Sequence, residues 1–298
     1  MYNIAEEARA EGMEIRPQIA GRPTGILHGL TSSFHMFATR PTWRRELASL
    51  SLEEKLAAMQ RPEIRAALLG ESSVTRNGPF GGDENEFLYR VFPLGERPDY
   101  EPDRAASVGG LAEAAGVTPL EMMYDLLLRD GGRELFYQPL GGYFTYNFDF
   151  FRKNMQHPNV IFGLSDGGAH CGVIADAGMP TFILTHWGRD RTKGERFPVE
   201  FLVRKLTRDT AMAYGLADRG QLQPGLLADV NVIDFDALRL YRPEAIYDLP
   251  AGGRRLVQRA DGYRYTVKSG QVTFEDGEST GALPGSLVRG GREARILA

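Results

Sequence analysis

An apolar run over residues 160–164 is the clearest strand signal in the chain. Pro158 precedes it, and Gly167 and Gly168 follow shortly after its end. A strand that is apolar at every position, and not only at every second one, is typical of a parallel strand buried on both faces. The pattern therefore predicts a buried parallel strand over residues 160–164, followed directly by a loop.

The N-terminal segment shows the pattern of a helix followed by a strand. Residues 3–11 are predicted to be helical, Gly12 ends that helix, and residues 13–19 read as a strand. A helix, a tight glycine turn and a strand form the second half of a strand–helix–strand unit. The chain is thus expected to begin within a repeating α/β pattern. Residues 20–41 are predicted to be a loop after the strand's carboxyl end.

The middle of the chain alternates between helical and irregular patterns. Pro62 is expected to split one helical region and to start its second helix, and Ser107 and Thr118 have the chemistry of helix N-caps. The predicted elements are helical residues 43–70, irregular residues 72–102 with a short strand at 87–92, helices at 107–115 and 118–129, a strand or extended loop at 134–140, and helices at 148–154 and 197–212.

From Leu222 onward, short alternating segments replace the helical pattern. Pro-Gly, Asp-Gly and Ser-Gly turns separate them, and residues 268–271 (KSGQ) have the composition of a hairpin turn. This texture predicts a small β domain. The expected strands lie at residues 229–234, 256–258, 263–268 and 271–275.

Composition and charge narrow the class of protein. The 298 residues carry a net charge of −4, which gives no electrostatic case for binding nucleic acid. No apolar run approaches the ~20 residues that span a bilayer, and the first residues lack a signal-peptide core. The single cysteine, Cys171, is compatible with a reducing compartment. We expect a cytoplasmic protein with no nucleic-acid and no membrane partner.

Asp166 is the first candidate for chemistry. It follows the predicted buried strand, and α/β barrels place catalytic residues at the carboxyl ends of their strands. Gly167 and Gly168 allow the backbone to take positive φ and to approach a ligand closely. Taken alone, Ser-Asp-Gly-Gly is equally ordinary turn chemistry.

Two blocks of sequence in order carry a resemblance to a known family. The first is residues 165–170 (SDGGAH), followed by Asp176, Pro180, Trp187 and residues 189–191 (RDR). The second is residues 217–220 (ADRG), followed by Pro-Gly and Ala-Asp-Val. Together they resemble the amidohydrolase superfamily, and within it the N-acyl-D-amino-acid deacylase (D-aminoacylase) branch.

The resemblance implies both a fold and an activity. The implied fold is α/β: the C-terminal portion of a TIM-like (β/α)8 metallo-hydrolase barrel, about its strands 7 and 8, in residues 1–215, with an insertion at about residues 40–115. A small β-sandwich-type domain would follow in residues 216–298. The implied activity is metal-dependent hydrolysis of a non-peptide C–N bond in a small N-acyl amino acid or related amide. The resemblance makes Asp166 both a ligand of zinc, or of another divalent metal, and the residue that handles the catalytic proton.

The resemblance also implies metal ligands that this chain does not match. The family has a His-x-His pair after its first barrel strand and histidines after strands 5 and 6. The histidines here are His28, His35, His157, His170 and His186, and no two have that spacing. We therefore expect a truncated chain that does not retain the metal alone. Two alternatives stay open: a non-catalytic remnant or binding module, and one half of a split enzyme that needs a complementary N-terminal half.

Four further residues are weaker candidates. His170 is either an outer partner that orients Asp166 or substrate, or a structural loop histidine. His35 is expected within reach of a substrate. Arg189 and Arg191 could hold a substrate carboxylate, or they could form an internal ion-pair cluster. His186 is expected to be packed or hydrogen-bonded.

Self-association is also expected for the isolated chain. The strand at residues 160–164 would lack one neighbour, and the aromatic stretches 136–146 and 148–151 would expose apolar surface.

Overall fold

A parallel strand pair lies at the centre of the chain. The computed structural model describes residues 2–72, 83–165 and 170–289. In it β1 (Gln18–Ile19) and β5 (Ile161–Phe162) run parallel, with Ile19 opposite Phe162. Both residues of β5 are buried, so the predicted buried parallel strand is confirmed at its central positions. In the described ranges β5 pairs with β1 alone.

The strand predicted over residues 13–19 is correct only for its last two residues. The helix before it is confirmed as α1 (Tyr2–Ala10), and Gly12 follows with a φ of +85°.

A second, antiparallel sheet was only partly predicted. It has the order β2 (Gly25–His28), β4 (Phe136–Pro139), β3 (Phe92–Pro93). The prediction of a loop throughout residues 20–41 is therefore wrong for β2, which is held by backbone pairing to a strand more than 100 residues away. A side chain at Gly25 would collide with the ring of Tyr137, so this crossing requires glycine.

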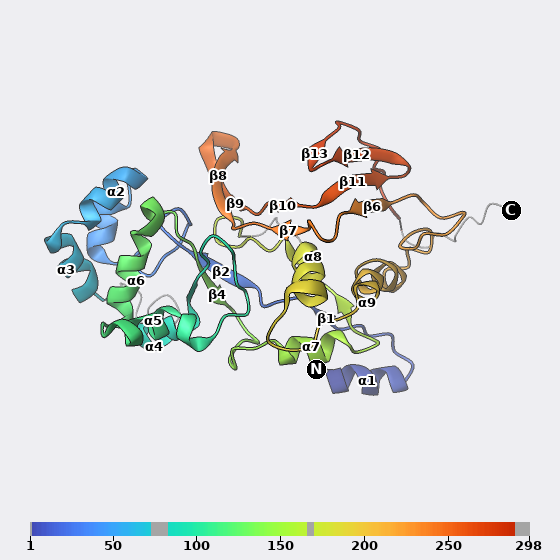
Figure 1. The fold of residues 1–298 in the computed structure, drawn as a ribbon, viewed down its shortest axis with the longest axis horizontal. Helices are drawn as coiled ribbons and strands as arrows, with labels where there is room; N and C mark the ends of the chain where they lie inside the picture. Colours follow the sequence, from blue (N-terminus) through green and yellow to red (C-terminus); the bar gives the residue numbers. More distant parts are fainter. Residues whose placement is uncertain (1, 73–82, 166–169, 290–298) are drawn as a thin grey trace.

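Helices gather at one end of the molecule, at the left of Figure 1. Pro62 begins its helix, as expected. Ser107 accepts a hydrogen bond from the Gly110 amide at 3.0 Å, and Thr118 forms a reciprocal capping box with Glu121. The helices are η1 (Trp43–Leu47), α2 (Leu52–Met59), α3 (Pro62–Gly70), α4 (Glu84–Phe87), η2 (Leu88–Arg90), η3 (Arg104–Ala106), α5 (Val108–Ala115), α6 (Pro119–Leu127) and η4 (Arg129–Gly132).

The strand predicted over residues 87–92 is mostly wrong. Asp83 accepts a hydrogen bond from the Asn85 amide at 2.8 Å and thereby caps α4, and η2 continues the helical path. Only Phe92 begins a strand.

The segment after β4 is helical around a fully buried tryptophan. Trp187 donates a hydrogen bond from Nε1 to the Gly21 carbonyl at 2.7 Å and so ties its helix to the residues after β1. The elements are α7 (Asp149–Met155), α8 (Met179–Phe182), η5 (Ile183–Asp190), α9 (Val199–Arg204), η6 (Lys205–Asp209) and α10 (Thr210–Ala213). The helices predicted over 148–154 and 197–212 are confirmed.

The C-terminal strands form three small sheets along the top of Figure 1. Ser269 and Gly270 have φ values of +52° and +79°, as a two-residue hairpin of the expected kind requires. The sheets are β6 (Val230–Ile233) with β11 (Tyr263–Lys268), β12 (Gln271–Glu275) and β13 (Glu278–Ser279), then β7 (Arg239–Leu240) with β10 (Ala260–Asp261), and β8 (Glu244–Leu249) with β9 (Gly253–Val257).

One apolar core joins these strands to the parallel pair. Leu238 and Leu256 belong to the same buried cluster as Ile19, Phe162 and Trp187. A second cluster lies among the helices α2 to α6. The fold is therefore mixed α/β, and the described residues form no closed barrel. The domain boundary at residues 215/216 stays a prediction.

The expected exposure of the aromatic stretches holds for some members only. Tyr137 and Phe148 are fully buried, whereas the side chains of Phe144 and Phe150 are 66% and 54% exposed. Self-association stays a prediction. No helix within the described ranges has the length and apolar character needed to cross a membrane.

Candidate active site at the ends of the parallel strands

The carboxyl ends of β1 and β5 meet at a buried ion pair. Arg22 follows β1, Asp176 belongs to the segment after β5, and Arg22 Nη1 lies 2.7 Å from Asp176 Oδ1. Their side chains are 1% and 2% exposed. Catalytic residues of α/β barrels lie at this edge. The predicted residues Asp166, Gly167 and Gly168 fall outside the described ranges.

Aromatic rings complete the environment of Arg22. Its guanidinium lies 4.0 Å from the centroid of the Tyr100 ring, a cation–π arrangement. Burial raises the pKa of the Asp176 carboxyl, and the charge and hydrogen bond of Arg22 oppose that rise. A paired, desolvated arginine and aspartate of this kind hold two segments together, and removing either partner leaves a buried charge.

Backbone hydrogen bonds fix residues 170–176 on two sides. The Leu27 amide donates to the Val173 carbonyl and the Leu256 amide to the Cys171 carbonyl, each at 2.7 Å. The segment is thus tied to β2 and to β9. His170 is exposed and has a φ of +53°, so its side chain is accessible from solvent at the start of this segment.

His35 does not line the surface of this region. It is 4% exposed, and its ring meets Trp43 edge-on with a centroid distance of 4.1 Å. Burial, with nearby His28, Lys55 and Arg254, lowers the pKa of His35 to about 3. His35 therefore lies in the core, although the sequence had predicted that a substrate could reach it.

Arg189 and Arg191 are engaged within the chain. Arg191 is buried and donates to both carboxylate oxygens of Glu101, at 3.0 and 2.9 Å. Arg189 donates to Asp190 at 2.6 and 2.9 Å and to the Leu238 carbonyl at 2.8 Å. These contacts fit the ion-pair interpretation. Binding of a substrate carboxylate by either arginine stays a prediction.

Glu101 is a buried acceptor that the sequence analysis did not identify. It also receives hydrogen bonds from His186 Nε2 at 2.9 Å and from the Phe148 amide at 2.8 Å. Burial alone would raise the pKa of Glu101, but the bonds from His186, Arg191 and Phe148 lower it to about 2. His186 is hydrogen-bonded and stacked on Phe182, as expected for a packed histidine.

The described residues do not fit the metal that the resemblance implied. Among them there is no group of three or more His, Cys, Asp or Glu side chains that could hold a metal ion. Asp166, the one residue matched to a metal ligand, lies outside this part of the chain.

Residues 97–274 match the family model described as "Amidohydrolase family" (Amidohydro_3), well over half of the chain. The chain belongs to the amidohydrolase family. The segment of this amidohydrolase that matches contains Glu101, Asp176, His186 and Arg191, whereas Arg22 lies before it.

The curated relatives of this amidohydrolase include uncharacterized proteins and a D-aminoacylase. Uncharacterized proteins of Mycobacterium tuberculosis and Mycobacterium bovis are 30% identical over 207 residues, which is 65% of this chain and 33% of each relative. The D-aminoacylase of Alcaligenes xylosoxydans xylosoxydans is 33% identical over 106 residues, 36% of this chain and 19% of that protein. The chain thus spans about a third of the length of the mycobacterial relatives it matches.

Solved D-aminoacylase structures also resemble the amidohydrolase. One is 24% identical and covers 66% of this chain and 37% of that chain, with a TM-score of 0.37. Another, described as having a binuclear metal center, is 21% identical and covers 78% and 44%, also with a TM-score of 0.37. Similarity at this level supports no transfer of individual residues.

Proposed function

We propose that this amidohydrolase chain contributes to the hydrolysis of a non-peptide C–N bond in a small amide, with N-acyl amino acids as the first substrate class. The family match over residues 97–274 carries the proposal. The 33% identity to a D-aminoacylase over 106 residues supports the substrate class.

Asp166 is the proposed proton-transfer residue. Its support is its position in the sequence, directly after β5 and within the SDGGAH run. It would accept a proton from the water that attacks the acyl carbonyl and then pass it to the nitrogen of the leaving amine. Gly167 and Gly168 would leave room for substrate near the backbone, and exposed His170 would orient Asp166 or substrate.

A zinc or other divalent ion would need ligands beyond the described residues. Asp166 would be one of them, and a structural or catalytic zinc typically takes three or four protein ligands. A complementary segment, carried by the same or another polypeptide, would supply the others. The Arg22–Asp176 pair would then fix the shared edge of the site.

Complementation tests the proposal. The chain would be co-expressed with the N-terminal two thirds of a related amidohydrolase, and release of free amine from N-acetyl-D-amino acids would be measured with added zinc. We expect hydrolysis by the complemented protein, and Asp166→Asn should lower the rate by roughly 10²–10⁴. Glu244→Gln, an exposed carboxylate on β8, is the matched control and should leave the rate unchanged.

Two results would overturn the proposal. Full activity of the complemented Asp166→Asn protein would remove Asp166 from the chemistry. A stable complex that binds N-acetyl-D-amino acids without hydrolysing them would favour the binding-module alternative.

A further inference from the structure

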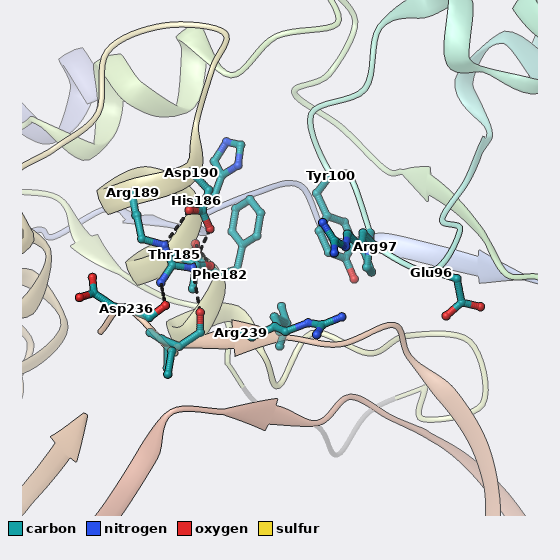
Figure 2. Close-up of a pocket in the computed structure, with 14 residues that line it drawn as sticks. Glu96, Arg97, Tyr100, Phe182, Thr185, His186, Arg189, Asp190, Asp236 and Arg239 are labelled. Carbon is teal, nitrogen blue, oxygen red and sulfur yellow. Dashed lines mark hydrogen bonds and ion pairs between the residues drawn. The ribbon is translucent and has the colours of Figure 1, made fainter. Parts of the chain in front are cut away.

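A pocket of about 440 Å³ opens between residues 96–100, helix η5 and strand β7. Its volume falls in the range of small-molecule sites. Figure 2 shows Phe182, His186, Tyr100 and Arg97 around the pocket, and the rings of Tyr100 and Phe182 meet edge-on with centroids 5.5 Å apart. The imidazole of His186 stacks on Phe182 with ring centroids 4.7 Å apart and planes inclined by 14°. Glu101 hydrogen-bonds His186 Nε2 and so holds the stacked pair of His186 and Phe182 in place as a fixed aromatic surface of the pocket.

Some of the charged groups around the pocket are already paired. Asp190 holds Arg189 through two hydrogen bonds of 2.6 and 2.9 Å. Glu96 lies 3.6 Å from Arg242, which pairs more closely with Asp130, at 2.8 Å. Arg189 and Asp190 therefore compensate each other before any ligand enters.

Two arginines of the lining are not committed in this way. Arg97 and Arg239 are exposed, and neither hydrogen-bonds to or pairs with an acidic group in the described part of the chain. The Arg239 guanidinium lies over the Tyr241 ring at 4.5 Å, which restricts its orientation. Asp236 is the remaining acidic side chain of the lining, and it forms an ion pair with neither arginine. Arg97 and Arg239 thus lack an acidic partner, in a lining that also carries the carboxylates of Glu96 and Asp236.

We propose that this pocket binds a small organic anion, a carboxylate with an aromatic or branched apolar body. Guanidinium groups match carboxylates in charge and in bidentate geometry. Arg97 and Arg239 would hold the carboxylate, and the apolar body would lie against Phe182 and Leu240. The described residues that line the pocket include none from residues 170–176, but Tyr100 is shared, because it also packs against Arg22 at the edge of the proposed hydrolytic site.

Binding of two matched probes tests the site. Phenylacetate and its uncharged analogue phenylacetamide would be titrated into the chain and followed by saturation-transfer NMR. We expect phenylacetate to bind about fivefold more tightly or better, and the Arg97→Gln/Arg239→Gln protein to lose that preference. Asp236→Asn should tighten phenylacetate binding, because it removes the opposing charge.

Arg259→Gln is the matched control. Arg259 is an exposed arginine that pairs with Glu244 at 3.0 Å and is not among the residues that line the pocket. Its loss should leave phenylacetate binding unchanged, with near-ultraviolet dichroism showing that each variant is folded. Equal affinity for both probes, no binding of either, or equal weakening by Arg259→Gln would overturn the proposal.

Discussion

Acid should destabilise this protein through His28 and His35. Both are buried, His28 at 0% and His35 at 4% exposure. Burial lowers the pKa of His28 from 6.5 to about 4, even though Gln138 hydrogen-bonds its ring at 2.6 Å, and the pKa of His35 falls to about 3. The unfolded chain takes up a proton at each histidine below pH 6.5, while the folded chain does not until pH 4 or lower. The free energy of unfolding is therefore unaffected by these two histidines above pH 6.5 and falls as the pH decreases toward 4.

The expected loss is large compared with the stability of a domain. Between pH 7 and pH 5, each histidine with an unfolded pKa near 6.5 and a folded pKa of 4 or below costs about 2 kcal/mol. The pair costs about 4 kcal/mol, against the ~5–15 kcal/mol of a typical domain. In this window most carboxyl groups of the unfolded chain stay ionised, so the histidines dominate the pH dependence.

Urea unfolding at pH 7 and pH 5, followed by tryptophan fluorescence, measures the effect. The variant His28→Gln/His35→Phe keeps an amide beside Gln138 and an aromatic ring beside Trp43, and it should lose about 4 kcal/mol less than the parent on acidification. The exposed histidine variant His170→Gln should behave like the parent. The reasoning fails if the double variant loses as much stability between the two pH values as the parent does.

Two further predictions concern buried charges. Arg22→Gln should destabilise the fold by about 3–5 kcal/mol, because Asp176 is left buried without its partner, whereas Arg22→Met/Asp176→Leu should recover most of that loss. Thermal unfolding of the single and double variants measures both effects. A double variant as unstable as the single one would contradict the prediction. Glu101→Gln should cost about 3 kcal/mol at pH 7, since the Glu101 pKa falls from 4.5 to about 2. That contribution is present above pH 4.5 and is lost as the pH falls toward 2, so parent and variant should converge near pH 2 in urea unfolding. Similar cost at both pH values would contradict it.

Elements whose signals are local were predictable from the sequence. Thr118, Pro119 and Glu121 form a complete start signal within four residues, and the capping box is present. The apolar run around β5 likewise carried enough information, because burial on both faces excludes polar side chains at every position. Strand β2 carried none, since its partner β4 lies more than 100 residues away.

Site residues, too, were predictable only where the signal is local. Asp176 belonged to the sequence block that carries the family resemblance but was not predicted as a site residue, and its partner Arg22, 154 residues away, could be found only from the structure. Arg189 and Arg191 are close in sequence, but η5 ends between them. Arg189 therefore contacts Asp190 and the Leu238 carbonyl, whereas Arg191 contacts Glu101. Glu101 had no local signal, because its hydrogen-bond donors lie far along the chain: Phe148 at the start of α7, and His186 and Arg191 in and directly after η5.

The parallel pairing of β1 with β5 sets a delay during synthesis of the chain. At roughly 5–20 residues per second, Phe162 leaves the ribosome roughly 7–30 s after its partner Ile19, which lies ~140 residues before it. Helices α2, α3 and α6, which carry their own start signals, can form in that interval, whereas β1 still lacks its β5 partner. The nascent chain should therefore be most dependent on chaperones between the appearance of residue 19 and that of residue 162.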